Sequence, residues 1–247
     1  MNARNLKILV VDDEPLARAR LKSLLADLDA GEVVAEAGDG HGAILAAQES
    51  GAQVVLLDIR MPGMDGLEAA RHLGNLHTPP AIIFTTAYDA HALAAFEANA
   101  VDYLLKPIRR ERLRTALDKT RGLNPVQLRE LEILKDPGSV RSHVSATLQG
   151  NLKLLPVADI CYFRAEHKYV TARHSRGELV LDEPLAALEE EFSGQFMRVH
   201  RNALAAQAHI RGLVKAVGGG HWLVFEGIED RLEVSRRLLA QVRRVLR

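Results

Sequence analysis

The amino-acid sequence predicts a multidomain protein, in which an α/β doubly wound domain with a (βα)5 parallel sheet precedes a mostly β domain. Apolar runs and amphipathic stretches alternate through the first half, as they do in repeated strand–helix units. Beyond a stretch with proline and glycine breakers, short strands follow at the spacing of an antiparallel domain. A chain of 247 residues fits two domains best, although its length alone also allows one. We expect domains at 1–122 and 140–247, joined by a linker at 123–139 that holds a short helix at 126–134.

The elements of the first half follow from its hydrophobic pattern. Five short apolar runs are expected to be strands, at 7–11, 33–37, 54–57, 81–84 and 101–104. Amphipathic stretches are expected to be helices, at 14–28, 40–50, 66–73, 89–99 and 110–121. Strands that alternate with helices in this way imply a parallel sheet with helices on both faces.

The second half reads as an antiparallel β domain with one helix. Its expected strands are at 143–148, 152–156, 160–164, 169–174, 178–181, 222–225 and 232–235. Leu185, Leu188 and Phe192 recur at helical intervals after Pro184, which predicts a helix with the acidic run 189–191 facing solvent.

Composition narrows the class of protein. The formal net charge is zero, yet residues 1–122 hold 14 Lys/Arg against 17 Asp/Glu, and residues 140–247 hold 16 against 12. The basic excess of the second half permits nucleic-acid binding. The single cysteine, Cys161, cannot form an intramolecular disulfide and is expected to be buried. The apolar run at 8–11 is too short for a signal peptide, and none approaches the ~18 residues of a membrane span, so we expect a soluble, cytoplasmic protein.

Polar residues stand where the expected parallel strands end. Asp12 and Asp13 follow the first strand, Asp58 the third, Thr86 the fourth and Lys106 the fifth. Ligands of doubly wound sheets collect at this edge, so the five side chains are expected to converge. Crowded carboxylates need a cation between them, and an all-oxygen set suits Mg²⁺.

This arrangement suits phosphoryl chemistry. With a metal neutralising phosphoryl oxygens, one carboxylate can become an acyl phosphate, and Asp58 is the candidate because it stands alone at the central strand. Lys106 would add a second positive charge and the Thr86 hydroxyl a hydrogen bond. Each residue taken singly has a structural alternative, such as a helix cap, a turn or a solvated lysine.

Four blocks carry a resemblance to a known family. Residues 10–15 (VVDDEP), 57–67 (LDIRMPGMDGL), 85–87 (TTA) and 102–107 (DYLLKP) resemble the signature blocks of CheY-like receiver domains, from residue 6 to about residue 121. The resemblance implies that a sensor histidine kinase phosphorylates Asp58. It also implies that Asp12, Asp13, Asp58 and the backbone carbonyl of Arg60 hold Mg²⁺.

The same resemblance implies a switch formed by Thr86 and Tyr103, with Thr86 moving toward the phosphoryl group. It further implies a cis peptide between Lys106 and Pro107. Taken alone, Tyr103 is better interpreted as an ordinary strand aromatic.

Basic and amide side chains of the second half gather in three clusters, at 166–169 (EHKY), 198–202 (RVHRN) and 235–237 (SRR). Such side chains contact DNA phosphates and base edges, provided that they lie on one surface. The domain shows no catalytic triad, no Cys-His metal spacing and no glycine-rich phosphate loop, so we expect no enzyme. Taken singly, His200 could be a structural histidine, and Arg236 and Arg237 could begin a solvated helix.

The second half also resembles a family, the LytTR DNA-binding domains. The matching blocks are 160–170, 185–189, 196–204 and 234–237, and the chain order and length are closest to the AlgR type. The resemblance implies a mostly β fold whose loops enter the major grooves of paired promoter repeats, with a homodimer on DNA. It implies these DNA contacts: His167, Lys168, His200, Arg201, Asn202, Arg236 and Arg237.

Together the two resemblances predict a two-component response regulator that controls transcription. A hydrolase with an aspartyl-phosphate intermediate is the enzymatic alternative, but it would carry a second aspartate two residues after Asp58, where Arg60 stands. A third possibility is a β domain that binds protein. Because contacts to several phosphates make DNA affinity fall steeply with salt, salt dependence separates these alternatives.

Overall fold

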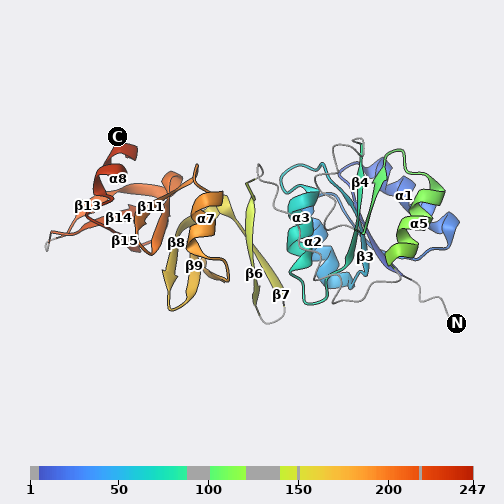
Figure 1. Cartoon of the computed structure of the whole chain (residues 1–247), viewed down its shortest axis with the longest axis horizontal. Coiled ribbons are helices and arrows are strands. Elements are labelled where there is room, and N and C mark those ends of the chain that lie inside the picture. The colour runs from blue at the N-terminus through green and yellow to red at the C-terminus, as the bar shows by residue number, and fades with distance from the viewer. Residues whose placement is uncertain (1–5, 88–100, 121–139, 149–150, 217–218, 247) are drawn as a thin grey trace. The chain divides into compact units, whose positions relative to one another are not determined.

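The computed structural model describes residues 6–87, 101–120, 140–148, 151–216 and 219–246 (Figure 1). The chain divides into two compact units, residues 1–139 with 147–152 and residues 140–146 with 153–247. The helices expected at 89–99 and 126–134 lie outside the described residues. In the part of the chain that is described, no helix is both long and apolar enough to cross a bilayer.

The first unit is a parallel sheet between two helical layers. Its strand order is β2-β1-β3-β4-β5, and every neighbouring pair is parallel. The strands are β1 (Lys7–Val11), β2 (Glu32–Ala37), β3 (Val54–Asp58), β4 (Ala81–Thr86) and β5 (Asp102–Leu105). The helices are α1 (Pro15–Leu28), α2 (Gly40–Ser50), α3 (Gly66–Gly74) and α5 (Arg110–Thr120). Figure 1 shows α1 and α5 on one side of the sheet and α2 and α3 on the other, so the predicted (βα)5 class is confirmed.

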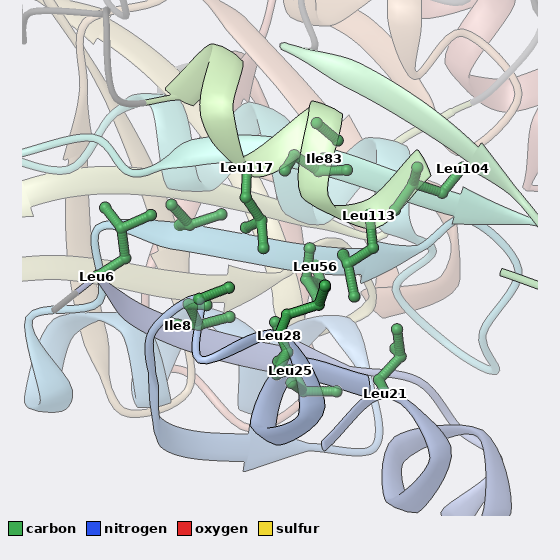
Figure 2. Packing of buried hydrophobic residues seen from close by; sticks show 14 of the residues in the cluster. Leu6, Ile8, Leu21, Leu25, Leu28, Leu56, Ile83, Leu104, Leu113 and Leu117 are labelled. Atoms are coloured by element: carbon green, nitrogen blue, oxygen red, sulfur yellow. The ribbon is translucent and has the colours of Figure 1, made fainter. Parts of the chain in front are cut away.

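The core of this unit explains why its strands read as continuous apolar runs. β3 is buried along its whole length because helices cover both faces of the sheet. On one face, leucines of α1 and α5 meet strand residues such as Ile8, Leu56 and Ile83 (Figure 2). Aspartates begin the helices of the other face: Asp39 accepts a hydrogen bond from the Gly42 amide, and Asp65 one from the Glu68 amide.

The described residues of the second half form antiparallel strands, two short α-helices and two single-turn 3-10 helices, Val157–Asp159 and Gln207–His209. One sheet has the order β10-β9-β8-β12-β11, a second has β13-β14-β15, and β6 pairs with β7. The strands are β6 (His143–Leu148), β7 (Asn151–Pro156), β8 (Ile160–Glu166), β9 (Tyr169–His174), β10 (Gly177–Leu181), β11 (Phe196–His200), β12 (Ala203–Ala206), β13 (Ile210–Lys215), β14 (His221–Phe225) and β15 (Arg231–Val234). The helices are α7 (Leu185–Glu191) and α8 (Leu239–Val245). The mostly β class predicted for this half is confirmed.

The five-stranded sheet of this unit is covered on both faces. Phe163 and Leu204 pack toward α7, whereas Tyr162, Ala203 and Ala205 pack toward the three-stranded sheet and α8. β12 is therefore buried along its whole length. The sequence did not predict β11, β12 or β13 as strands. For β12 the reason is that its Ala-Leu-Ala-Ala run has neither alternation nor β-branched side chains.

The acidic run of α7 differs from its expectation. Glu190 is exposed, but Glu189 pairs with Arg198, and Glu191 receives hydrogen bonds of 2.8 Å from Arg141. The Arg141 guanidinium is also held by Glu183 and is only 12% exposed. These glutamates hold arginines at the surface of the unit, so the expectation that all three face solvent was wrong.

Candidate metal centre and nucleic-acid interface

An acidic cluster lies at the carboxyl ends of two neighbouring strands. Asp12 and Asp13 follow β1, and Asp58 ends β3, which pairs with β1 in parallel. Carboxylate oxygens of the three residues all lie within 4.8 Å of one another. Asp12 and Asp58 are buried and Asp13 is exposed. The structure thus brings the three side chains together, with one side of the cluster reaching solvent.

Lys106 follows β5 and places its ammonium group against these carboxylates. Its Nζ atom lies 2.7 Å from Asp12 Oδ2 and 3.3 Å from Asp58 Oδ1. Its backbone amide donates a 2.7 Å hydrogen bond to the carbonyl of Thr86, which ties the end of β5 to β4. The Lys106–Pro107 peptide is cis, as the resemblance implied. The ammonium group therefore contacts two of the three carboxylates.

Burial governs the electrostatics of the cluster. Burial raises the pKa of Asp58 and the charges of Asp12 and Asp13 add to the rise, against the opposing charge of Lys106. Burial also disfavours the Lys106 ammonium, but its contacts with Asp12 and Asp58 outweigh this and raise its pKa. The lysine therefore stays charged while Asp58 remains electrostatically unfavourable as an anion. A further cation at the cluster would relieve this repulsion.

Two residues that support the cluster carry no clear signal in the sequence. Arg18 donates a 2.7 Å hydrogen bond to the backbone carbonyl of Asp12, and it reads like any charged residue of a surface helix. A Cβ atom on Gly66 would stand 2.0 Å from the carbonyl oxygen of Asp58. Only glycine allows α3 to begin this close to Asp58.

The three basic clusters of the second unit meet at one end of its sheets. The turn after β8 holds His167 and Lys168, and the turn before β12 holds Arg201 and Asn202. Because β12 runs antiparallel to β8, these turns are neighbours, and the Ala165 amide donates a 2.8 Å hydrogen bond to the Asn202 carbonyl.

The third cluster joins the same end through β11. The Ser235 amide donates a 2.9 Å hydrogen bond to the carbonyl of Val199, so Arg236 and Arg237 follow directly beside the end of β11. Both arginines are exposed in the turn between β15 and α8, and neither belongs to the strand or the helix. The three clusters therefore form one surface, which we call the three-turn surface (167–168, 200–202 and 236–237).

Exposure differs among the residues of the three-turn surface. His167, Lys168, Arg201, Arg236 and Arg237 are exposed, whereas His200 and Asn202 are half-buried. The neighbouring Arg198 is occupied by Glu189 and by the carbonyl of Arg201, so it supports the turn.

The first turn has an unusual backbone. His167 and Lys168 have φ angles of 48° and 78°, the left-handed region that glycine and asparagine occupy most easily. Such residues cost on the order of 1 kcal/mol each and persist where the surrounding structure imposes them. In this turn, the left-handed conformations place two exposed basic residues at the end of the β8–β9 hairpin.

Known proteins match both halves of the chain. The model of the response regulator receiver domain matches residues 8–118, and that of the LytTr DNA-binding domain matches residues 150–247. The chain is 47% identical to the positive alginate biosynthesis regulatory protein of Pseudomonas aeruginosa, over 98% of this chain and 99% of the relative. The chain belongs to the LytTR-type response regulators. Both resemblances stated above, including that to the AlgR type, are confirmed.

Other members of this family are similar along the whole chain. Sensory transduction protein LytT of Bacillus cereus is 34% identical, and transcriptional regulatory protein BtsR of Escherichia coli is 32% identical. Both comparisons cover 98% of this chain and 99% of the relative. The chain thus has the domain composition of a two-component transcription regulator.

The acidic cluster of this response regulator fits a magnesium ion by its chemistry. It offers carboxylate oxygens, an excess of negative charge, and an exposed side at Asp13 from which waters could complete the coordination of an ion. Arg60 stands two residues after Asp58 with its side chain exposed. That the backbone carbonyl of Arg60 is a ligand of the magnesium ion remains a prediction.

The two expected switch residues lie on adjacent strands. Thr86 ends β4, is buried, and pairs with Leu105 of β5. Tyr103 is half-buried on β5, and its ring stacks on Phe84 with centroids 5.5 Å apart. The switch itself remains a prediction.

Proposed function

We propose that this response regulator is phosphorylated on Asp58 by a sensor histidine kinase and then controls transcription by binding promoter DNA. Residues 1–122 act as the receiver, 123–139 as the linker and 140–247 as the DNA-binding domain. The observation that carries the proposal is the three-turn surface, where separate basic turns of a domain with a basic excess converge.

Phosphoryl transfer uses the groups already placed around Asp58. Its carboxylate oxygen attacks phosphorus as the bond to the donor's histidine nitrogen breaks, so the phosphoryl group moves without net oxidation. Asp12, Asp13, Asp58 and the Arg60 carbonyl would hold Mg²⁺, which would supply positive charge to the phosphoryl oxygens when bound.

The side chains around Asp58 then stabilise the product. The Lys106 ammonium, 3.3 Å from Asp58 Oδ1, contacts a phosphoryl oxygen, and the Thr86 hydroxyl bonds another. The ring of Tyr103 then moves toward the position that Thr86 has left. Phosphorylation adds negative charge beside residues that are already crowded, which biases the receiver toward a different arrangement of these groups.

DNA binding follows from charge and shape at the three-turn surface. Exposed His167, Lys168, Arg201, Arg236 and Arg237 contact phosphates and base edges from three separate turns. His200 contributes from the end of β11, and Asn202 from the turn before β12. Because each copy presents one such surface, two copies bind paired repeats as a homodimer on double-stranded DNA.

The experiment is genome-wide DNA capture with the purified full chain, with and without a small phosphodonor and Mg²⁺. Promoter fragments that share a repeated motif are expected, with stronger recovery after phosphodonor treatment. Arg201→Ala is expected to weaken the enrichment strongly while leaving a measurable affinity.

Arg211→Ala is the matched control, because Arg211 is exposed at the end of β13 that lies away from the three-turn surface. Lys215, at the other end of β13, pairs with His221, and His221 pairs with Val234, which shortly precedes Arg236 and Arg237. The enrichment by Arg211→Ala is expected to equal that of the wild type. Labelling of Asp58 without enriched DNA would contradict the proposal and favour a protein-binding output domain.

A further inference from the structure

Asn202 is fastened to β8 by both its backbone and its side chain. Its backbone carbonyl accepts the 2.8 Å hydrogen bond from the Ala165 amide, and its side-chain nitrogen Nδ2 donates a 3.2 Å hydrogen bond to the Ala165 carbonyl. The other end of the carboxamide, Oδ1, bonds the ring atom Nδ1 of His200. A single half-buried amide therefore connects β8 to the imidazole.

The direction of these bonds fixes where the histidine proton lies. A backbone carbonyl only accepts, so the nitrogen end of the Asn202 amide must face Ala165. The oxygen end then faces His200 and also only accepts, so Nδ1 must carry a hydrogen. A neutral imidazole has one N–H, which leaves Nε2 as a hydrogen-bond acceptor. Among the described residues, no hydrogen-bond partner occupies Nε2 of His200.

We propose that Asn202 is a positioning residue that makes His200 a hydrogen-bond acceptor, so that His200 reads a base with an exocyclic amine. This inference rests on the proposed DNA binding. In the major groove, adenine N6 and cytosine N4 are the donors, whereas guanine and thymine present O6 and O4 acceptors. His200 therefore selects an amino base over a keto base on the strand that it contacts.

The same bonds change the role expected of Asn202 itself. Bidentate recognition of adenine by an asparagine needs both its oxygen and its nitrogen. The Asn202 oxygen is bonded to His200, and its nitrogen to Ala165. Asn202 therefore acts through His200, and the base contact belongs to the histidine.

The first test is nitrogen NMR of the His200 ring in the full chain without DNA, at mildly alkaline pH where imidazoles are neutral. The wild type is expected to carry its proton on Nδ1. Asn202→Ala is expected to shift the ring toward the Nε2–H form, and Asn202→Asp to retain the Nδ1–H form because a carboxylate still accepts from Nδ1. An Nε2–H ring in the wild type would overturn the inference.

The second test is selection of DNA from a pool with randomised half-sites. The wild type is expected to prefer A or C over G or T at one position of the motif, and Asn202→Ala to weaken that preference about fivefold, as for one lost hydrogen bond. His200→Ala is expected to weaken the same position, with no added effect in the double variant. Asn202→Asp is expected to retain the preference, and Gln195→Ala, at the opposite end of β11, to leave it unchanged.

The outcomes separate the two proposals. A wild-type chain that selects a motif, with Asn202→Ala selecting the same motif equally strongly, overturns the role of Asn202 and leaves DNA binding intact. Loss of the preference in Asn202→Asp as well would assign the effect to the Ala165 bond and overturn the role of the tautomer. A wild-type chain that selects no sequence overturns DNA binding, and the base readout with it.

Discussion

The acidic cluster and the three-turn surface both lie where strands end, but the unfavourable interactions at the two sites are of different kinds. In the receiver the conflict is electrostatic, because buried Asp58 lies beside Asp12 and Lys106 offsets part of their charge. In the output domain the conflict lies in the backbone, where His167 and Lys168 adopt left-handed conformations while their side chains are exposed. The acidic cluster is therefore suited to accept a positive charge, whereas the three-turn surface exposes basic side chains.

The largest effect on this comparison is expected from a substitution of Asp58. Asp58→Asn removes the nucleophile while keeping the shape of the side chain, so labelling by a radioactive phosphodonor is expected to disappear entirely while the circular dichroism spectrum stays unchanged. Asp39→Asn is the control, because Asp39 is an exposed helix cap and asparagine caps equally well. Label that persists on the Asp58→Asn variant would contradict the assignment of Asp58 as the phosphoryl acceptor.

Gly66 tests how tightly the receiver site is packed. Gly66→Ala places a methyl group 2.0 Å from the Asp58 carbonyl oxygen and is expected to lower the free energy of unfolding by about 3 kcal/mol. Chemical denaturation of the full chain measures the change. Gly38→Ala is the control, because its Cβ would meet only the Arg18 side chain at 3.7 Å, and equal effects of the two variants would refute the close approach.

Magnesium tests whether a cation relieves the repulsion at the acidic cluster. Mg²⁺ at a hundredfold excess over its dissociation constant is expected to stabilise the receiver by about 2.7 kcal/mol, and chelation to remove the gain. Thermal unfolding with and without the ion measures it. Asp13→Asn, which alters the exposed ligand, is expected to lose most of the stabilisation, and an undiminished response in that variant would speak against the ligand set.

The turn between β8 and β9 tests the other half of the comparison. Replacing His167 and Lys168 together by Asn and Gly matches residue type to the left-handed backbone and is expected to stabilise the domain by about 1 kcal/mol. The same change removes two exposed contacts, so DNA affinity is expected to fall. Thermal unfolding and DNA titration check the two effects, and a loss of both stability and affinity would contradict the strain assigned to the turn.

The sequence predicts the receiver better than the output domain for a physical reason. A parallel sheet places the carboxyl ends of its strands at one edge, so Asp12, Asp58 and Lys106 can be assigned to one site from their positions alone. Its buried strands are also recognisable as continuous apolar runs. Arg18 and the close approach at Gly66 stay hidden because they depend on distances that no residue pattern encodes.

The output domain offers weaker signals because its contacts are made across strands far apart in the sequence. β12 is a short alanine-rich strand buried on both faces, and nothing in its pattern marks it as one. The bond from Asn202 to Ala165 depends on the register of β12 against β8. The three basic clusters could be found in the sequence, but their convergence required the antiparallel pairing.

The central claim, that three separate turns form one DNA-binding surface, is tested most directly by the salt dependence of binding to a captured promoter fragment. The affinity of the wild type is expected to fall steeply with salt, and Arg201→Ala and Arg236→Ala are each expected to reduce the slope of log K against log salt by about 1. Arg211→Ala is expected to keep the wild-type slope. Unchanged slopes in both Arg201→Ala and Arg236→Ala would contradict the surface.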